Sequence, residues 1–397
     1  MPYQPGRHFL QLPGPTNTPL AVLQAMALPT IDHRGPEFGV LTRELLSSIK
    51  TVFNTKHPVI IYPSSGTGAW EAAFVNTLSP GDKVLMFETG HFAVIWRKLA
   101  ERLGLVTDLI PSDWREGVDA KAIGARLAED KAHTIKAVAV VHSETSTGTI
   151  SDIPAVRRVM DELKHPALLI VDNVSSLGGM DYRHDEWGVD VTISGSQKGL
   201  MLPPGISFNA ISPKALEASK SARLIRSYWD WEDMLTFNKT GYFPHTPNTN
   251  LLQGLKVALD MLHKEGLENV YARHERAAEA TRRCILQWGF ELQARKPSEY
   301  SPILATVRMP EGYSADKLRA EILTRYNMTL GSGLGKLADK VFRIGHLGDF
   351  HDLMVTGTLT GIEMGMKVMG IPHRSGGVDA AMNYLSGNAE AMAAAAQ

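Results

Sequence analysis

The chain has 397 residues, 44% of them hydrophobic, and a formal net charge of -1 at pH 7. This length favours about two to three domains with a large buried core. The near-zero charge provides no electrostatic attraction to nucleic acid or to an anionic membrane, so we expect small-molecule partners.

Strand and helix patterns alternate through the first half of the chain. The predicted order is strand 57–63, helix 68–78, strand 83–87, helix 92–103, strand 105–110, helix 120–129, strand 137–142, helix 154–163, and then strands 167–171, 189–193 and 206–211. Repeated strand–helix units imply a mainly parallel sheet, which is typical of an α/β fold.

The pattern changes after Pro247. Long helical runs at 251–264 and 267–288 are followed by strand 303–307, helix 315–326, strand 340–344 and helix 352–369. This change predicts a large domain over residues 1–266 and a smaller C-terminal α+β domain over residues 267–397. We expect the alanine-rich tail after Gly387 to fray.

A lysine and an aspartate each follow a strand-like run. Asp172 ends the apolar run 167–171, and Lys198 closes the segment 194–198 after the run 189–193. An amine that forms an imine with an aldehyde, and a carboxylate that keeps a pyridine nitrogen protonated, together suit pyridoxal phosphate chemistry. Taken singly, a solvated surface lysine and an aspartate that caps a turn or helix explain the same residues.

The segment 64–68, Ser-Ser-Gly-Thr-Gly, joins a predicted strand to a predicted helix. Backbone N–H groups and small hydroxyls at a helix N-terminus can bind phosphate. A Ser/Gly-rich turn that caps the helix and binds no ligand would have the same sequence. The segment lacks the lysine of a P-loop, which argues against nucleotide triphosphate hydrolysis. The later glycine-rich segment 331–335 is a weaker candidate for a phosphate site, because no strong strand precedes it.

Cysteine content and apolar runs bear on location. Cys284 is the only cysteine, which excludes an intrachain disulfide and fits a reducing compartment. Residues 1–19 contain no apolar core of signal-peptide length, and no stretch approaches the roughly 18 apolar residues that cross a bilayer. We therefore expect a cytoplasmic protein without a membrane segment. The 14 histidines show no His-Glu-x-x-His pattern, so no metal site is predicted.

Seven parts of the sequence, taken together and in order, resemble the class V aminotransferases of fold type I, and among them the serine-glyoxylate and alanine-glyoxylate group. They are PGPTN (13–17), DHR (32–34), SGTG with WE (65–71), HSETSTG (142–148), VDNVSS (171–176), GSQKG (195–199) and FRIGH (342–346). The resemblance runs through nearly the whole chain and implies pyridoxal 5'-phosphate as the cofactor.

The resemblance also implies roles for single residues. It makes Lys198 the Schiff-base lysine and Asp172 the partner of the pyridinium nitrogen, and it places Thr145 near the cofactor ring and Phe92 stacked on it. The implied phosphate contacts are Ser65, Gly66, Thr67 and Gln197.

Other implied roles concern the substrate and the subunit interface. Arg343 is the clamp for the substrate α-carboxylate, because a planar guanidinium offers two parallel charge-assisted hydrogen bonds. Arg34, supplied by the opposite subunit, and Asn17 lie near the substrate side chain. Thr246 reaches the phosphate of the neighbouring subunit. The resemblance therefore implies a homodimer with shared active sites, and the choice between a dimer and a tetramer stays open.

The implied reaction moves the amino group of L-serine to glyoxylate in a ping-pong cycle that yields hydroxypyruvate and glycine. Alanine and aspartate remain open as donors, because they share the amino acid head group that Arg343 would hold. A desulfurase or lyase shares the fold, but it needs a mobile thiol, and Cys284 lies in a helical run as a buried structural residue. A binding protein without turnover would lack the lysine or the clamp. Four positions depart from the family pattern and bear on the choice of donor: Ser143, Asn173, His245 and Asn248.

Overall fold

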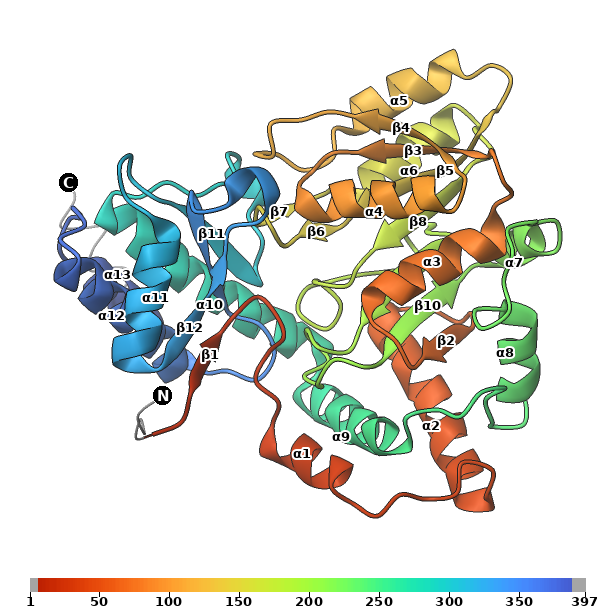
Figure 1. Cartoon of the computed structure of the whole chain (residues 1–397), viewed down its shortest axis with the longest axis horizontal. Coiled ribbons are helices and arrows are strands. Elements are labelled where there is room, and N and C mark those ends of the chain that lie inside the picture. The colour runs from red at the N-terminus through yellow and green to blue at the C-terminus, as the bar shows by residue number, and fades with distance from the viewer. Residues whose placement is uncertain (1–5, 388–397) are drawn as a thin grey trace.

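The computed structural model describes residues 6–387 and shows two lobes, each built on its own sheet (Figure 1). The larger lobe holds a seven-stranded sheet and the smaller lobe a four-stranded sheet. The predicted fraying tail after Gly387 lies outside the described residues.

The seven-stranded sheet confirms the predicted mainly parallel architecture. Its strands are β2 (Val59–Tyr62), β3 (Lys83–Phe87), β4 (Val106–Ile110), β5 (Ile135–Val141), β8 (Leu168–Asp172), β9 (Val191–Gly195) and β10 (Ser207–Ile211). Their order in space is β2-β10-β9-β8-β5-β3-β4, and β10 alone runs antiparallel to its neighbours β2 and β9.

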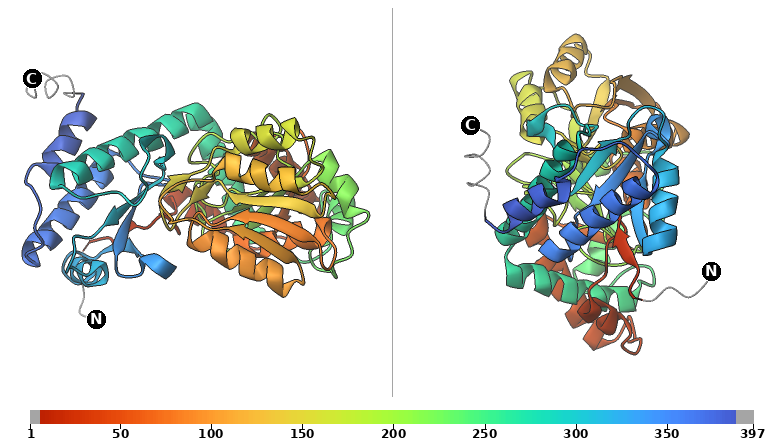
Figure 2. Two further views of the ribbon diagram at one scale, coloured as in Figure 1. Left: turned by 90° about the horizontal axis from the view of Figure 1, so that it is seen from above. Right: turned by 90° about the vertical axis from the view of Figure 1, so that its left-hand side faces the viewer.

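Helices cover both faces of this sheet because alternate strand residues point to opposite sides (Figure 2). Val84 and Met86 of β3 pack in the same core as α3 (Gly66–Thr77) and α4 (His91–Arg102). Leu85 and Phe87 pack in a second core with α5 (Ala120–Glu129) and α6 (Ile153–Glu162). Burial on both faces explains why the strands are continuous apolar runs.

The remaining helices of the larger lobe lie along its edge. They are α1 (Leu20–Met26), α2 (Pro36–Phe53), α7 (Pro213–Ser219), α8 (Trp231–Asn238) and α9 (Thr249–Glu265). The sequence analysis missed α2, although Pro36 in its first turn and buried Phe38, Leu45 and Ile49 follow helix signals.

The smaller lobe contains α10 (Leu267–Trp288), β11 (Leu304–Arg308), α11 (Ala315–Tyr326), β12 (Met328–Ser332), β13 (Val341–Gly345), α12 (Asp352–Val368) and α13 (Gly377–Leu385). Its sheet has the order β1-β12-β13-β11, with β1 (Phe9–Gln11) parallel to β12. The predicted large domain 1–266 therefore needs a correction at its start, because residues 9–11 complete the smaller sheet. The division at residue 267 coincides with the start of α10 and stays a prediction.

A second correction concerns the segment 331–335. The sequence analysis found no strong strand before it, whereas β12 runs into it and ends at Ser332. The pattern was missed because the strand sequence Met-Thr-Leu-Gly-Ser contains a glycine and no β-branched residue other than Thr329.

Within residues 6–387, none of the helices combines the length and the apolar character needed to cross a membrane.

Candidate active site

Asp172 is fixed at the carboxyl end of β8, in the middle of the larger sheet. Its Oδ1 accepts a hydrogen bond from the Val174 backbone N–H at 2.7 Å, and its Oδ2 accepts one from Trp70 Nε1 at 3.0 Å. The pKa of Asp172 is raised to about 7, mainly by burial and also by Glu144, while the two hydrogen bonds and Lys198 oppose the rise. A bound cation would therefore stabilise the carboxylate form.

Lys198 lies three residues beyond β9 and is almost fully buried. Its pKa is lowered to about 8, mainly by burial and also by Arg343, while Asp172 opposes the change. The lowered pKa increases the fraction of neutral amine, which is the nucleophilic form. The Nζ atom donates a hydrogen bond to the Pro13 carbonyl at 2.6 Å.

The N-terminal segment that follows β1 packs directly on this lysine. Thr16 Oγ1 donates to the Lys198 carbonyl at 3.1 Å, and the Thr16 N–H donates to the Gln197 carbonyl at 3.2 Å. Gly14 has a φ of +109°, and a Cβ there would lie 2.4 Å from Lys198 Nζ. Only glycine suits this position. The sequence analysis quoted residues 13–17 for the resemblance but gave Pro13 and Gly14 no role at the lysine.

The predicted phosphate segment forms the N-terminus of α3. Ser65 is the N-cap residue with extended backbone, and its side chain makes no capping hydrogen bond. A Cβ on Gly66 would lie 2.6 Å from Val174 Cγ2, so a glycine is needed beside the loop that follows Asp172. The N-terminal N–H groups of α3 and the hydroxyls of Ser65 and Thr67 provide the donors that a phosphate requires.

These elements enclose a cavity of about 280 Å³. Eight predicted site residues line it: Ser65, Gly66, Thr67, Phe92, Thr145, Asp172, Gln197 and Lys198. Gly14 and Trp70 are among the lining residues that were given no site role, and Trp70 also orients Asp172. Trp70 could have been predicted as a site residue, because it lies two residues after the predicted phosphate segment SGTG.

The residues present fit pyridoxal phosphate. Two buried side-chain oxygens of residues that line the cavity, Thr145 Oγ1 and Gln197 Oε1, have no hydrogen-bond partner among residues 6–387. A helix N-terminus, an amine and a carboxylate thus surround one cavity together with unpaired polar atoms. This donor set matches a phosphate, an aldehyde and a ring nitrogen.

Arg343, in β13, contacts the backbone of Thr145 and so joins the smaller lobe to the larger lobe. Its Nε donates to the Ser332 carbonyl at 2.7 Å, and its Nη1 donates to the Thr145 carbonyl at 2.9 Å. Burial lowers the pKa of Arg343 to about 10, and Glu144 opposes this. A guanidinium has five N–H donors, so those not bound to carbonyls remain for a substrate carboxylate.

Glu144, in β6 (Ser143–Glu144), is a buried carboxylate that the sequence analysis did not single out. Its Oε2 accepts from the Ala93 N–H at 3.2 Å, and its Oε1 accepts from the Phe92 N–H at 3.4 Å and from Ser146. It therefore caps α4 and fixes the start of the helix that carries Phe92. It also places a negative charge near Arg343.

Four predicted residues do not line this cavity: Arg343, which adjoins it through Thr145, and Arg34, Thr246 and Asn17. Arg34 and Thr246 are exposed, and Asn17 is half-buried with its side chain bound to the Leu10 carbonyl at 3.0 Å. The roles that the resemblance gives Arg34 and Thr246 belong to a neighbouring subunit and stay predictions. The role given to Asn17 also stays a prediction.

The four departures from the family pattern have structural partners. Asn248 caps α9 by accepting from the Leu251 N–H at 3.1 Å, and His245 stacks on Tyr228 with ring centroids 4.5 Å apart. Ser143 contacts Ser301, with 3.1 Å between the two hydroxyl oxygens, and Asn173 accepts a hydrogen bond from the Ser176 hydroxyl.

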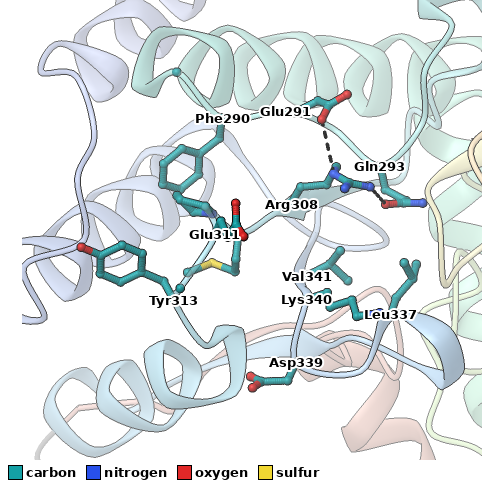
Figure 3. Close-up of a pocket in the computed structure, with 14 residues that line it drawn as sticks. Phe290, Glu291, Gln293, Arg308, Glu311, Tyr313, Leu337, Asp339, Lys340 and Val341 are labelled. Carbon is teal, nitrogen blue, oxygen red and sulfur yellow. Dashed lines mark hydrogen bonds and ion pairs between the residues drawn. The ribbon is translucent and has the colours of Figure 1, made fainter.

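Other sites compete poorly with this one. A larger cavity, of about 570 Å³, lies on the smaller lobe, where Figure 3 shows Arg308 between Glu291 and Gln293. None of the predicted site residues lines it, and Arg308 is already paired, 3.3 Å from Glu291 and 3.0 Å from Gln293. Among residues 6–387, no group of three or more His, Cys, Asp or Glu side chains is arranged to hold a metal. Cys284 is buried in α10 and unsuited to a mobile thiol, and burial raises its pKa.

Comparison with known proteins identifies the family. Residues 8–336 match the family model described as "Aminotransferase class-V". The chain belongs to the class V aminotransferase family. A serine–glyoxylate aminotransferase from Hyphomicrobium methylovorum is 47% identical over 390 residues, which cover 97% of this chain and 96% of that protein. An L-aspartate–glyoxylate aminotransferase from Paracoccus denitrificans is 46% identical, covering 94% and 95% of the two chains.

A solved aminotransferase structure is also similar. The ureidoglycine–glyoxylate aminotransferase from Bacillus subtilis superposes with a TM-score of 0.89 at 26% identity, covering 97% of this chain and 100% of that one. The aminotransferase fold predicted from the sequence is thereby confirmed.

Proposed function

We propose that this transaminase moves the amino group of L-serine to glyoxylate, giving hydroxypyruvate and glycine, with pyridoxal 5'-phosphate as its cofactor. The observation that carries the proposal is the placement of Lys198 and Asp172 on one cavity, with Arg343 adjoining it through Thr145. The name of the Hyphomicrobium relative supports serine as donor and glyoxylate as acceptor.

The residues of the chain divide the work by their chemistry. Ser65, Thr67 and the N–H groups of α3 would hold the phosphate, and Asp172 would hold the ring nitrogen in its protonated form. When bound, the cofactor supplies an electron sink that acidifies the substrate Cα–H. Lys198 Nζ accepts the proton from that Cα, because its lowered pKa leaves a neutral amine available near pH 8.

Arg343 would orient the substrate. Two backbone carbonyls hold the guanidinium in place. Its remaining N–H groups would therefore bind a substrate carboxylate with little further loss of side-chain entropy. A fixed α-carboxylate in turn fixes the direction of the Cα–H bond toward Lys198. Serine and glyoxylate both carry the carboxylate that this arrangement requires.

Completion of the site by a second copy is part of the proposal. Arg34 and Thr246 are exposed in the single chain and away from its own cavity. In a homodimer they would approach the cavity of the partner, Thr246 toward the phosphate and Arg34 toward the substrate side chain.

Aspartate is the second candidate donor, because the Paracoccus relative named for aspartate is as similar as those named for serine. The donors differ by a hydroxyl or a carboxylate at one end, a difference that a few contacts decide.

The visible spectrum of the holoenzyme tests both points. We would titrate it in parallel with L-serine, L-alanine and L-aspartate and then add glyoxylate. Fastest loss of the cofactor band with serine, and its return with glyoxylate, is the expected result. Fastest loss with aspartate would transfer the assignment to that donor. No change with any donor would contradict the proposed reaction.

Lys198→Ala provides the matched control for the chemistry. It should bind the cofactor only noncovalently and show no turnover, because the amine that moves the proton is gone. Full activity in Lys198→Ala would rule out the mechanism.

A further inference from the structure

Glu88 and Lys336 form an ion pair between the two lobes, close to the site but outside its cavity. Glu88 follows β3 directly and lies four residues before Phe92. Lys336 lies in a short 3-10 helix, η2 (Gly335–Leu337), four residues after Ser332. The pair therefore connects the segment that carries the stacking aromatic with the segment that holds the carboxylate clamp.

Trp114 makes this contact more than an exposed ion pair. Its Nε1 donates to Glu88 Oε1 at 2.8 Å, and Lys336 Nζ lies 4.9 Å from the centre of a Trp114 ring. The Glu88 side chain is only 10% exposed, whereas that of Lys336 is 63% exposed. Leu337 and Val341 pack on Trp114 beside the pair. Glu88 thus accepts a hydrogen bond from Trp114 and pairs with Lys336, and a cation–π contact joins Lys336 to Trp114, so that the three side chains form one cluster.

The segment 331–337 links this cluster to Arg343. Its Ser332 carbonyl accepts from Arg343 Nε at 2.7 Å, and a Cβ on Gly331 would lie 2.9 Å from Arg343 Cβ. A Cβ on Gly333 would lie 2.0 Å from the Leu337 carbonyl oxygen. Close packing on both sides leaves the segment little room to shift without moving the carbonyl that holds the guanidinium.

We propose that the Glu88–Lys336 pair positions the segment 331–337 against the larger lobe and thereby holds Arg343 in the orientation that binds the substrate α-carboxylate. Neither residue touches the substrate, so both are positioning residues. The inference rests on the proposed function in one respect: it takes the carboxylate that Arg343 binds to be that of the amino acid or 2-oxo acid substrate.

The consequence follows from how Arg343 is held. Its two carbonyl partners come from different lobes, Ser332 from the smaller and Thr145 from the larger. If the segment 331–337 moves away from the larger lobe, the guanidinium loses its fixed direction, while Lys198 and Asp172 keep their places. Binding of carboxylate substrates should then weaken more than turnover at saturation.

Lys336→Met is the test variant, and the chain offers a close control. Lys367 is 65% exposed and pairs with Glu363, which is 12% exposed and accepts from Trp288 Nε1 at 3.0 Å. Lys367→Met therefore removes the same kind of contact, but within the smaller lobe alone. Lys336→Met should still fold with its lobes together, because Arg115–Glu291 and Arg295–Glu116 also join them.

In the holoenzyme, Lys336→Met should raise KM for the amino donor and for glyoxylate about three- to tenfold, with kcat within about twofold of the wild type. Added salt should raise KM of the wild type by a larger factor than that of Lys336→Met, because only the wild type has the Glu88–Lys336 pair to screen. Lys336→Arg should restore the wild-type values, and Lys367→Met should match them throughout. Equal KM values in Lys336→Met and Lys367→Met, or a fall in kcat alone, would overturn the inference.

Hydrogen exchange of the apoprotein gives a readout that does not depend on activity. The Leu337 N–H donates to the Leu334 carbonyl at 3.0 Å, and the Ala338 N–H donates to the Gly335 carbonyl at 3.1 Å. Both amides should exchange faster in Lys336→Met than in the wild type or Lys367→Met. Unchanged exchange would overturn the positioning role. Faster exchange in an enzyme that rejects serine and glyoxylate would support it and contradict the proposed function instead.

Discussion

Replacing Asp172 with asparagine tests how strongly burial acts on the carboxylate at the centre of the cavity. In the folded apoprotein its pKa is about 7, against 3.8 for an exposed aspartate, with burial as the largest cause. The folded state therefore binds more protons than the unfolded state between pH about 4 and 7. Stability contributed by this group falls as pH rises through that window, because the acid must ionise in a site that disfavours the charge.

The size of the effect follows from that difference. At about 1.4 kcal/mol per pKa unit, the difference between the folded-state pKa of about 7 and the value of 3.8 for an exposed aspartate corresponds to about 4 kcal/mol of lost stability above pH 7. Asp172→Asn removes the charge, but its single amide oxygen cannot accept from both Val174 N–H and Trp70 Nε1, at a cost of about 1 kcal/mol. The variant apoprotein should be about 3 kcal/mol more stable than the wild type at pH 8, and within about 1 kcal/mol of it at pH 4.

Urea unfolding of both apoproteins at the two pH values measures this difference directly. The same variant of the holoenzyme should lose nearly all turnover, because asparagine cannot stabilise a protonated ring nitrogen. A variant that is less stable than the wild type at pH 8, or that differs from it equally at both pH values, would refute the assignment of burial as the main cause.

Three further changes address the surroundings of the lysine and the clamp. Arg343→Ala should raise KM for serine and glyoxylate by about 10- to 150-fold, the value of a charge-assisted hydrogen bond, and unchanged steady-state KM values would remove Arg343 from the site. Gly14→Ala, with φ at +109° and a Cβ 2.4 Å from Lys198 Nζ, should lose activity while circular dichroism shows an intact fold; normal activity would contradict the close approach. Glu144→Gln should lower stability by about 1–2 kcal/mol through the lost cap of α4, read as a lower urea midpoint, and an unchanged midpoint would rule out the capping role.

Local sequence patterns were enough to predict the strands of the larger sheet, several helices and the polar residues at strand ends, although α2 and β12 were missed. Apolar runs that alternate with helix patterns predicted the strands of the larger sheet, and α5, α10 and α11 have the predicted bounds. Asp172 and Lys198 could be singled out because one ends a strand and the other lies three residues beyond a strand, at the strand ends where parallel sheets present functional side chains. These signals lie within a few neighbouring residues, so they survive without knowledge of the fold.

The tertiary structure alone decided which distant segments meet. It added β1 to the smaller sheet beside β12, and it brought Pro13 to Lys198 and Trp70 to Asp172. It also joined Glu88 to Lys336 across the lobes. Such contacts depend on the complementary shapes and charges of surfaces that form only when whole lobes pack. Local propensity and periodicity describe each segment separately, and therefore do not predict which other segment it packs against.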